Sequence, residues 1–163
     1  MLQNLDVSDT LIALGQFVKN DTAVDEFVSE HFSGDLKVVV GNVTRQIAPT
    51  VEDCPYIVFT NFRKKEGQNI DFCEYACDVW IGLTADNSVV DEDGIEMLEV
   101  YDTGSKFMHL IEDIFNDKTK RNRPLSRCET AGPYALDAKH WVGSMDLTWR
   151  IYQTMGPTYQ EEL

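Results

Sequence analysis

The last long regular stretch of the chain, residues 141–152, alternates large apolar side chains with polar ones. Its apolar positions are Trp141, Met145, Leu147, Trp149 and Ile151, and the polar positions between them are Ser144, Asp146, Thr148 and Arg150. A period of two over this length predicts a long, half-buried β-strand. A slip of one residue would expose both tryptophans, so the register should be strongly specified, and the strand needs long antiparallel neighbours.

The stretch 53–84 predicts those neighbours. Pro55 suits the first position of a strand, and residues 56–62 are predicted to continue as that strand. The polar connection 64–69 contains a glycine and has the length of a hairpin loop, and residues 70–84 predict a second strand. Together these residues predict a long hairpin.

Helical periodicity occurs near the N-terminus and again after the hairpin. Two short helices are predicted in the first 34 residues, with Ser8 or Asp9 capping the first and Asp21 or Thr22 the second. One long amphipathic helix of about 25 residues is predicted from apolar positions that recur at three, four and seven. These positions are Ile95, Leu98, Tyr101, Met108, Ile111 and Phe115. Gly104 is expected to be a weak point or bend in this helix, which should cover the sheet.

Between the long helix and the last strand, residues 125–130 predict a strand and residues 131–138 a loop. Residues 153–163 contain a Gly-Pro pair and are expected to form a flexible tail. A chain of 163 residues suits one hydrophobic core. The prediction is therefore a single α+β domain over residues 1–152, with a mainly antiparallel sheet, a long hairpin, one long amphipathic helix packed on one face, and N-terminal helices.

Charge narrows the classes of partner. Acidic residues outnumber basic ones 28 to 14, and the net charge of −14 opposes nonspecific binding to nucleic acids or anionic membranes. No apolar run approaches the roughly 18 residues of a membrane span, and no signal peptide is recognisable, so we expect a soluble, cytosolic product. Two basic clusters are predicted to face other proteins: Arg63, Lys64 and Lys65, and Lys118, Lys120, Arg121, Arg123 and Arg127. For the second cluster, stabilisation of the preceding helix dipole is the alternative.

Candidate chemistry is sparse. The four cysteines, Cys54, Cys73, Cys77 and Cys128, are expected to be reduced thiols. Cys73 and Cys77 lie about 13 Å apart on a predicted strand, which is too far for two ligands of one zinc ion. A dyad of Cys128 with His109 or His140 could form only through the fold. We find no phosphate-binding loop, nucleophile elbow or calcium-loop spacing, and we predict no catalytic residue, cofactor or metal.

In order and size, residues 8–152 resemble the tail terminator, or tail completion, proteins of long-tailed bacteriophages. The resemblance is one of layout, without a short diagnostic motif. The features that carry it are two N-terminal helices, a strand opening with Pro55-Tyr56-Ile57-Val58, the long hairpin, the long amphipathic helix, and a late strand that begins His140-Trp141 and ends Trp149-Arg150.

The resemblance implies a structural virion protein without enzymatic activity. In that family the subunits form a ring, usually of six, that caps the tail tube and offers a docking surface to the head connector. The implied partners are other copies of the chain, the tail tube protein and a connector or neck protein, while DNA passes through the lumen without specific binding. The implied location is the tail or neck of the virion, after synthesis in the host bacterial cytoplasm.

Two features depart from the family layout: the doubled N-terminal helices and the acidic stretch 86–93. They leave open another neck or tail component of similar fold. A different alternative is an acidic inhibitor that imitates DNA and occupies a nucleic-acid enzyme, and a third is an enzyme, which would need a pocket of converging polar groups. The dispersed acids and the regularly alternating sheet favour the ring protein.

Overall fold

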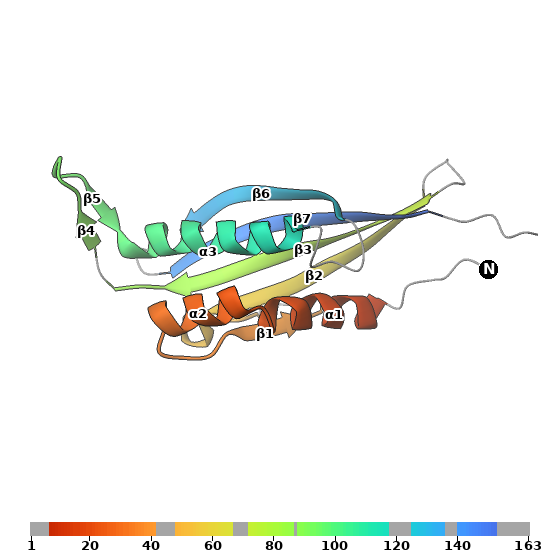
Figure 1. Cartoon of the computed structure of the whole chain (residues 1–163), viewed down its shortest axis with the longest axis horizontal. Coiled ribbons are helices and arrows are strands. Elements are labelled where there is room, and N and C mark those ends of the chain that lie inside the picture. The colour runs from red at the N-terminus through yellow and green to blue at the C-terminus, as the bar shows by residue number, and fades with distance from the viewer. Residues whose placement is uncertain are drawn as a thin grey trace, which may run out of the picture.

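The computed structural model describes residues 7–41, 48–66, 72–86, 88–117, 125–135 and 140–152. The helices are α1 (Val7–Lys19), α2 (Thr22–His31), α3 (Glu99–Asn116) and the short 3-10 turn η1 (Val51–Asp53). The strands are β1 (Lys37–Val40), β2 (Tyr56–Glu66), β3 (Phe72–Thr84), β4 (Ser88–Val90), β5 (Glu96–Leu98), β6 (Leu125–Ala135) and β7 (His140–Tyr152) (Figure 1). The predicted α+β class is confirmed. The predicted tail, 153–163, lies outside the described residues.

Five strands form the main sheet in the order β1-β2-β3-β7-β6. β1 runs parallel to β2, and the other neighbours are antiparallel. β3 and β7 pair without a register break from Phe72 opposite Tyr152 to Thr84 opposite His140. The last strand therefore has long antiparallel neighbours on both sides, as its alternation requires.

The sheet is irregular in β2. Its register with β3 shifts between Thr60 and Arg63, and Asn61 adopts a positive φ of 51° there. A bulge of this kind re-aims the side chains that follow it, so Arg63 comes to lie opposite Ala76 and Phe62 reaches the ring of Tyr75.

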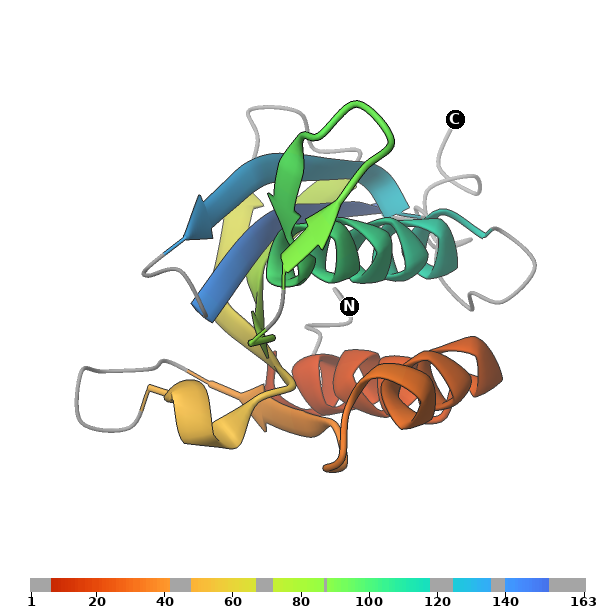
Figure 2. The ribbon, with the colours of Figure 1, turned by 90° about the vertical axis from the view of Figure 1, so that its left-hand side faces the viewer.

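The three helices lie on one face of the sheet (Figure 2). α3 packs on β3, β7 and β6, and α1 packs on β1 and β2. Phe27 of α2 stacks on Phe107 of α3 with ring centroids 5.0 Å apart, which joins the two helical parts. The buried strand residues of this core are Ile57, Phe59, Tyr75, Cys77, Val79, Ile81, Leu83, Trp141, Met145 and Leu147. One hydrophobic core results.

Of the two predicted helix caps, the second is confirmed and the first is wrong. Asp21 precedes α2, and its carboxylate accepts a hydrogen bond of 3.0 Å from the backbone N–H of Ala23, which confirms the second cap. The first cap was predicted wrongly, because α1 begins at Val7, before both Ser8 and Asp9. Asp9 instead lies in the first turn, where its charge favours the helix dipole.

The long helix is shorter than predicted. α3 begins only at Glu99, and residues 88–98 form the hairpin β4–β5, so the helical assignment of Ile95 and Leu98 was wrong. The Asp91 side chain accepts hydrogen bonds from the backbone N–H groups of Asp93 and Ile95. Gly94 has a φ of 79°, a conformation that breaks the helical repeat and closes a tight turn.

Strand β6 is longer than predicted. It continues to Ala135, through part of the predicted loop 131–138. Its register with β7 shifts between Ala131 and Tyr134, around Pro133. Proline cannot donate to a strand ladder, but β6 is an edge strand, and edges and bulges are the places in a sheet that accept proline.

Gly104 lies inside a helix that is continuous from Glu99 to Asn116. A Cβ atom at this position would lie 2.5 Å from Cδ2 of Trp141, whose side chain is only 1% exposed. The absence of a side chain thus lets α3 approach the indole of β7 directly.

We predict that Gly104→Ala destabilises the protein. Alanine favours a helix over glycine by about 1 kcal/mol, but overpacking against a buried indole costs about 1–3 kcal/mol, so we expect a net loss of about 1–2 kcal/mol. The measurement is the free energy of unfolding in urea. The control is Gly34→Ala, where a Cβ would meet no atom within 4 Å and the change should stay within about 0.5 kcal/mol. A Gly104→Ala protein as stable as wild type would contradict the packing described.

Candidate interaction surfaces

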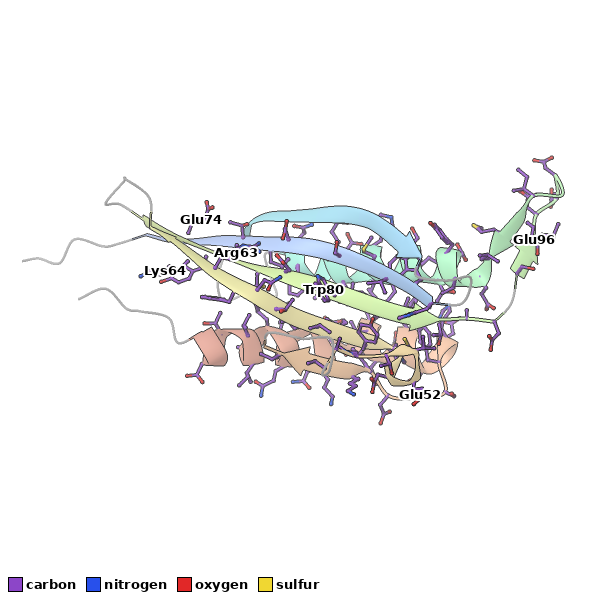
Figure 3. The ribbon with its side chains drawn as sticks, turned by 180° about the vertical axis from the view of Figure 1, so that it is seen from behind. Glu52, Arg63, Lys64, Glu74, Trp80 and Glu96 are labelled. Atoms are coloured by element: carbon purple, nitrogen blue, oxygen red, sulfur yellow. The ribbon has the colours of Figure 1, made fainter. Side chains whose placement is uncertain are left out.

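The face of the sheet opposite the helices carries a charged cluster that joins three adjacent strands (Figure 3). Arg63 of β2 lies between two carboxylates: its Nη1 is 2.7 Å from Oδ1 of Asp78 on β3, and its Nη2 is 3.3 Å from Oδ1 of Asp146 on β7. Asn61 donates a hydrogen bond of 2.8 Å to Oδ2 of Asp78. We call these four residues the Arg63 cluster.

The two carboxylates of the Arg63 cluster are direct register partners across β3 and β7, where like charges repel. Burial acts to raise the pKa of Asp78, but hydrogen bonds from Asn61, from the Asp146 carboxyl group and from Arg63 bring it below its usual value. The pKa of Asp146 is raised by its hydrogen bond with Asp78, by burial and by the Asp78 charge. A proton entering the pair therefore binds Asp146 first.

These contacts give Arg63 a structural role within the sheet. Of its two predicted companions, Lys64 is exposed on β2, and Lys65, whose side chain lies outside the described part of the chain, stands opposite Glu74 in register. The cluster 63–65 therefore lies among acids, and one of its three cations is already held by Asp78 and Asp146.

The second predicted basic cluster is largely beyond the described residues. Lys118, Lys120, Arg121 and Arg123 lie outside them, and Arg127 stands opposite Thr148 in β6, with its side chain also undescribed. The prediction that these residues form a protein-facing patch stays a prediction.

Aromatic side chains also lie on this face of the sheet. Trp80 lies half-buried on it, between its register partners Val58 and Ser144 (Figure 3). Near the end of β3, the Tyr56 hydroxyl lies 3.4 Å from Nε2 of His140. Burial raises the pKa of Tyr56 to about 12, so its hydroxyl stays protonated at neutral pH.

The thiols of the described side chains are unreactive in character. Burial raises the pKa of Cys77, and that of Cys54, to about 12, so neither is a thiolate at neutral pH. His140 lies beside Tyr56, His109 lies 3.7 Å from Glu112, and the Cys128 side chain is not among those described. Within the described ranges, no three metal-binding side chains gather.

The hairpin β4–β5 projects from one end of the molecule (Figures 1 and 2). We call residues 88–98 the arm. Large apolar side chains on the arm, and at its junction with α3, are exposed: Val90 by 61%, Ile95 by 63%, Met97 by 46%, Leu98 by 38% and Tyr101 by 39%. The arm also carries Asp91, Glu92, Asp93 and Glu96 and contains no lysine or arginine. Exposed large apolar side chains that are concentrated in one segment point to an interaction site.

Sequence reasoning missed the arm because its apolar residues also fit a helical period. The local signal was present, since Asp93-Gly94 follows Val89-Val90 and precedes Ile95, and Asp-Gly between β-formers favours a hairpin.

No protein-family model matches the chain, and neither does any curated protein. Among the described helices, none has the length and apolar character to cross a membrane. The function must therefore be inferred from the residues and their arrangement.

We predict opposite effects for two neutral substitutions in the Arg63 cluster. Because the folded pKa of Asp146 is raised, its charged form costs stability once the pH rises above that pKa. Asp146→Asn should therefore raise the free energy of unfolding at pH 7, by a few tenths to about 1 kcal/mol because the site is largely exposed. The gain should disappear near pH 3, where wild-type Asp146 is already protonated.

Asp78→Asn serves as the matched comparison. The folded pKa of Asp78 is lowered, so its charge stabilises the fold above the unfolded pKa, and this contribution is lost as the pH falls through the folded pKa. The substitution should cost about 1–2 kcal/mol at pH 7 and less at low pH. Urea unfolding at several pH values measures the free energy of unfolding of both variants. If the two substitutions changed the free energy of unfolding in the same direction at pH 7, the assignment of charge to Asp78 and Asp146 would be contradicted.

Proposed function

We propose that this chain is a structural protein of a long-tailed phage, six copies of which form a ring on top of the tail tube. The ring would end tube polymerisation and offer the docking surface for the head connector. The proposal combines the layout resemblance of residues 8–152 with the surfaces described above. It assigns the protein an assembly role without catalysis.

The arm is the observation that carries this proposal. Its two strands have three residues each and pair only with one another in the described part of the chain. An isolated two-stranded hairpin is marginally stable in water, and keeping its apolar side chains in contact with water is unfavourable in free energy. Such an element is expected where association with another protein will cover it.

Charge also supports a ring that surrounds DNA. Each chain carries a net charge of −14, so six copies would carry −84. Negative potential around a lumen repels phosphate groups and prevents DNA from adhering as it passes. The same charge also suits an acidic DNA mimic, which is the competing function and which would block DNA binding by a nucleic-acid enzyme.

The proposal predicts a closed oligomer in solution. Native mass spectrometry of the purified chain, alone and after mixing with tail tubes, should give a species of about 112 kDa, six times the 18.6 kDa chain. An open series of sizes that grows with concentration would argue against closure, and a monomer under all these conditions would contradict the ring.

The proposal also predicts a phage phenotype. Loss of the gene should leave tails of uncontrolled length, or tails that fail to join heads, as seen by electron microscopy of lysates. Complementation with the intact gene is the control. Particles of normal tail length and normal joining would contradict the proposed role, and a DNA mimic would produce that result.

A further inference from the structure

We infer that the outer edge of β5 in the arm is a docking site for an extended segment of another protein, in which apolar residues alternate with lysine or arginine. The segment would add a third strand to the hairpin β4–β5. The inference goes beyond the proposed function, because it names the chemistry of the arm's partner and holds whether or not the chain forms a ring. The backbone directions in β5, its exposure and the charge of the arm support it.

The backbone of β5 presents hydrogen-bonding groups to its outer edge. The N–H of Asp91 donates to the carbonyl of Ile95 at 3.0 Å, so the backbone carbonyl of Ile95 faces β4. Hydrogen-bonded and non-hydrogen-bonded residue pairs alternate along an antiparallel ladder. The next pair is Val90 with Glu96, and the N–H and carbonyl of Glu96 therefore point away from β4. Outward backbone groups of this kind are a template for a further strand.

No strand in the described part of the chain pairs with this edge, because β4 and β5 form a two-stranded sheet of their own. All three residues of β5, Glu96–Leu98, are exposed, and Ile95 just before them is 63% exposed. The hairpin projects beyond the end of the five-stranded sheet, where a partner can reach it (Figure 1). A third strand would stabilise the arm, since two short strands alone are marginally stable in water.

The side chains on both faces of β5 fit one pattern of partner. Ile95 and Met97 lie on one face of the hairpin, whereas Glu96 and Leu98 lie on the other face with Val90. Residues that stand directly opposite in neighbouring strands share a face and contact each other. An added strand would place apolar side chains beside Ile95 and Met97, and a cation beside Glu96 on the other face. Alternation of apolar and basic residues provides both.

The charge of the arm favours a basic partner over a second copy of the chain. Residues 86–99 contain six acids and no lysine or arginine, so they attract a basic segment and repel an acidic one. A second copy has a net charge of −14 and would bring the same excess of acid to the contact. The acids at the turn, residues 91–93, likewise oppose insertion of the arm into an anionic membrane.

The test measures binding of a short, fluorescently labelled peptide that alternates valine with lysine. Titration with the full-length wild-type chain should raise the fluorescence anisotropy of the peptide to saturation. A second peptide of the same sequence carries a methyl group on every backbone nitrogen, which removes the N–H groups that would bond to β5. We expect the methylated peptide to bind at least tenfold more weakly, although its charge is the same.

Two substitutions in the full chain separate the β5 edge from general attraction between opposite charges. Glu96→Lys reverses the charge beside the added strand and should weaken binding of the unmethylated peptide at least tenfold. Glu26→Lys, at an exposed position of α2, changes the net charge by the same amount and should alter binding less than twofold. Unfolding midpoints equal to that of wild type would show that both variants fold.

Saturable binding that needs both the backbone N–H groups of the peptide and Glu96 supports the inference. Absence of binding to wild type, equal binding of the two peptides, or equal loss in the two variants would each overturn it. Sedimentation velocity without peptide tests a second copy as the occupant, and self-association that Glu96→Lys abolishes would overturn the inference in favour of that copy. Flotation of wild type, but not of Ile95→Ser, with phosphatidylcholine vesicles would overturn it in favour of a membrane.

Discussion

The unbroken register between β3 and β7 is the constraint on which the rest of the structure depends. Thirteen consecutive pairs fix which side chains face the helices and which face the other way. Because side chains alternate along a strand, this register places Trp141, Met145 and Leu147 in the core and sets Asp78 opposite Asp146 on the uncovered face. A slip of one residue would exchange the two sets, burying carboxylates and exposing the indole.

The two faces that this register creates are held in different ways. The helix face is closed by apolar packing, which includes the direct contact of α3 with the Trp141 indole at Gly104. The opposite face is joined by the Arg63 cluster, which spans three strands with charge-assisted hydrogen bonds. The chain then leaves β3 beyond the core and forms the arm before it returns as α3. Among the described residues, the candidate surfaces for association are the sheet face with the Arg63 cluster and the apolar, acidic arm.

The sequence revealed those parts of the fold that depend on short-range regularity. The alternation of residues 141–152 predicted β7, and Asp21 predicted the cap of α2. The arm was missed because Ile95 and Leu98 match the helical repeat of α3, and that repeat outweighed the local turn at Asp93-Gly94. The Arg63 cluster could not be predicted, since Arg63 and Asp146 are 83 positions apart and meet only once three strands are in register.

Hydrogen–deuterium exchange of the full chain, compared between the dissociated protein and the form assembled with its partner proteins, tests most directly whether this protein works by covering its arm. Amides of residues 88–98 should exchange rapidly when dissociated, because three-residue strands open readily, and should become protected on assembly. Amides of β3 and β7 should be protected in both states. An arm that exchanges equally fast in the assembled form, with protection gained elsewhere, would contradict the proposed mode of assembly.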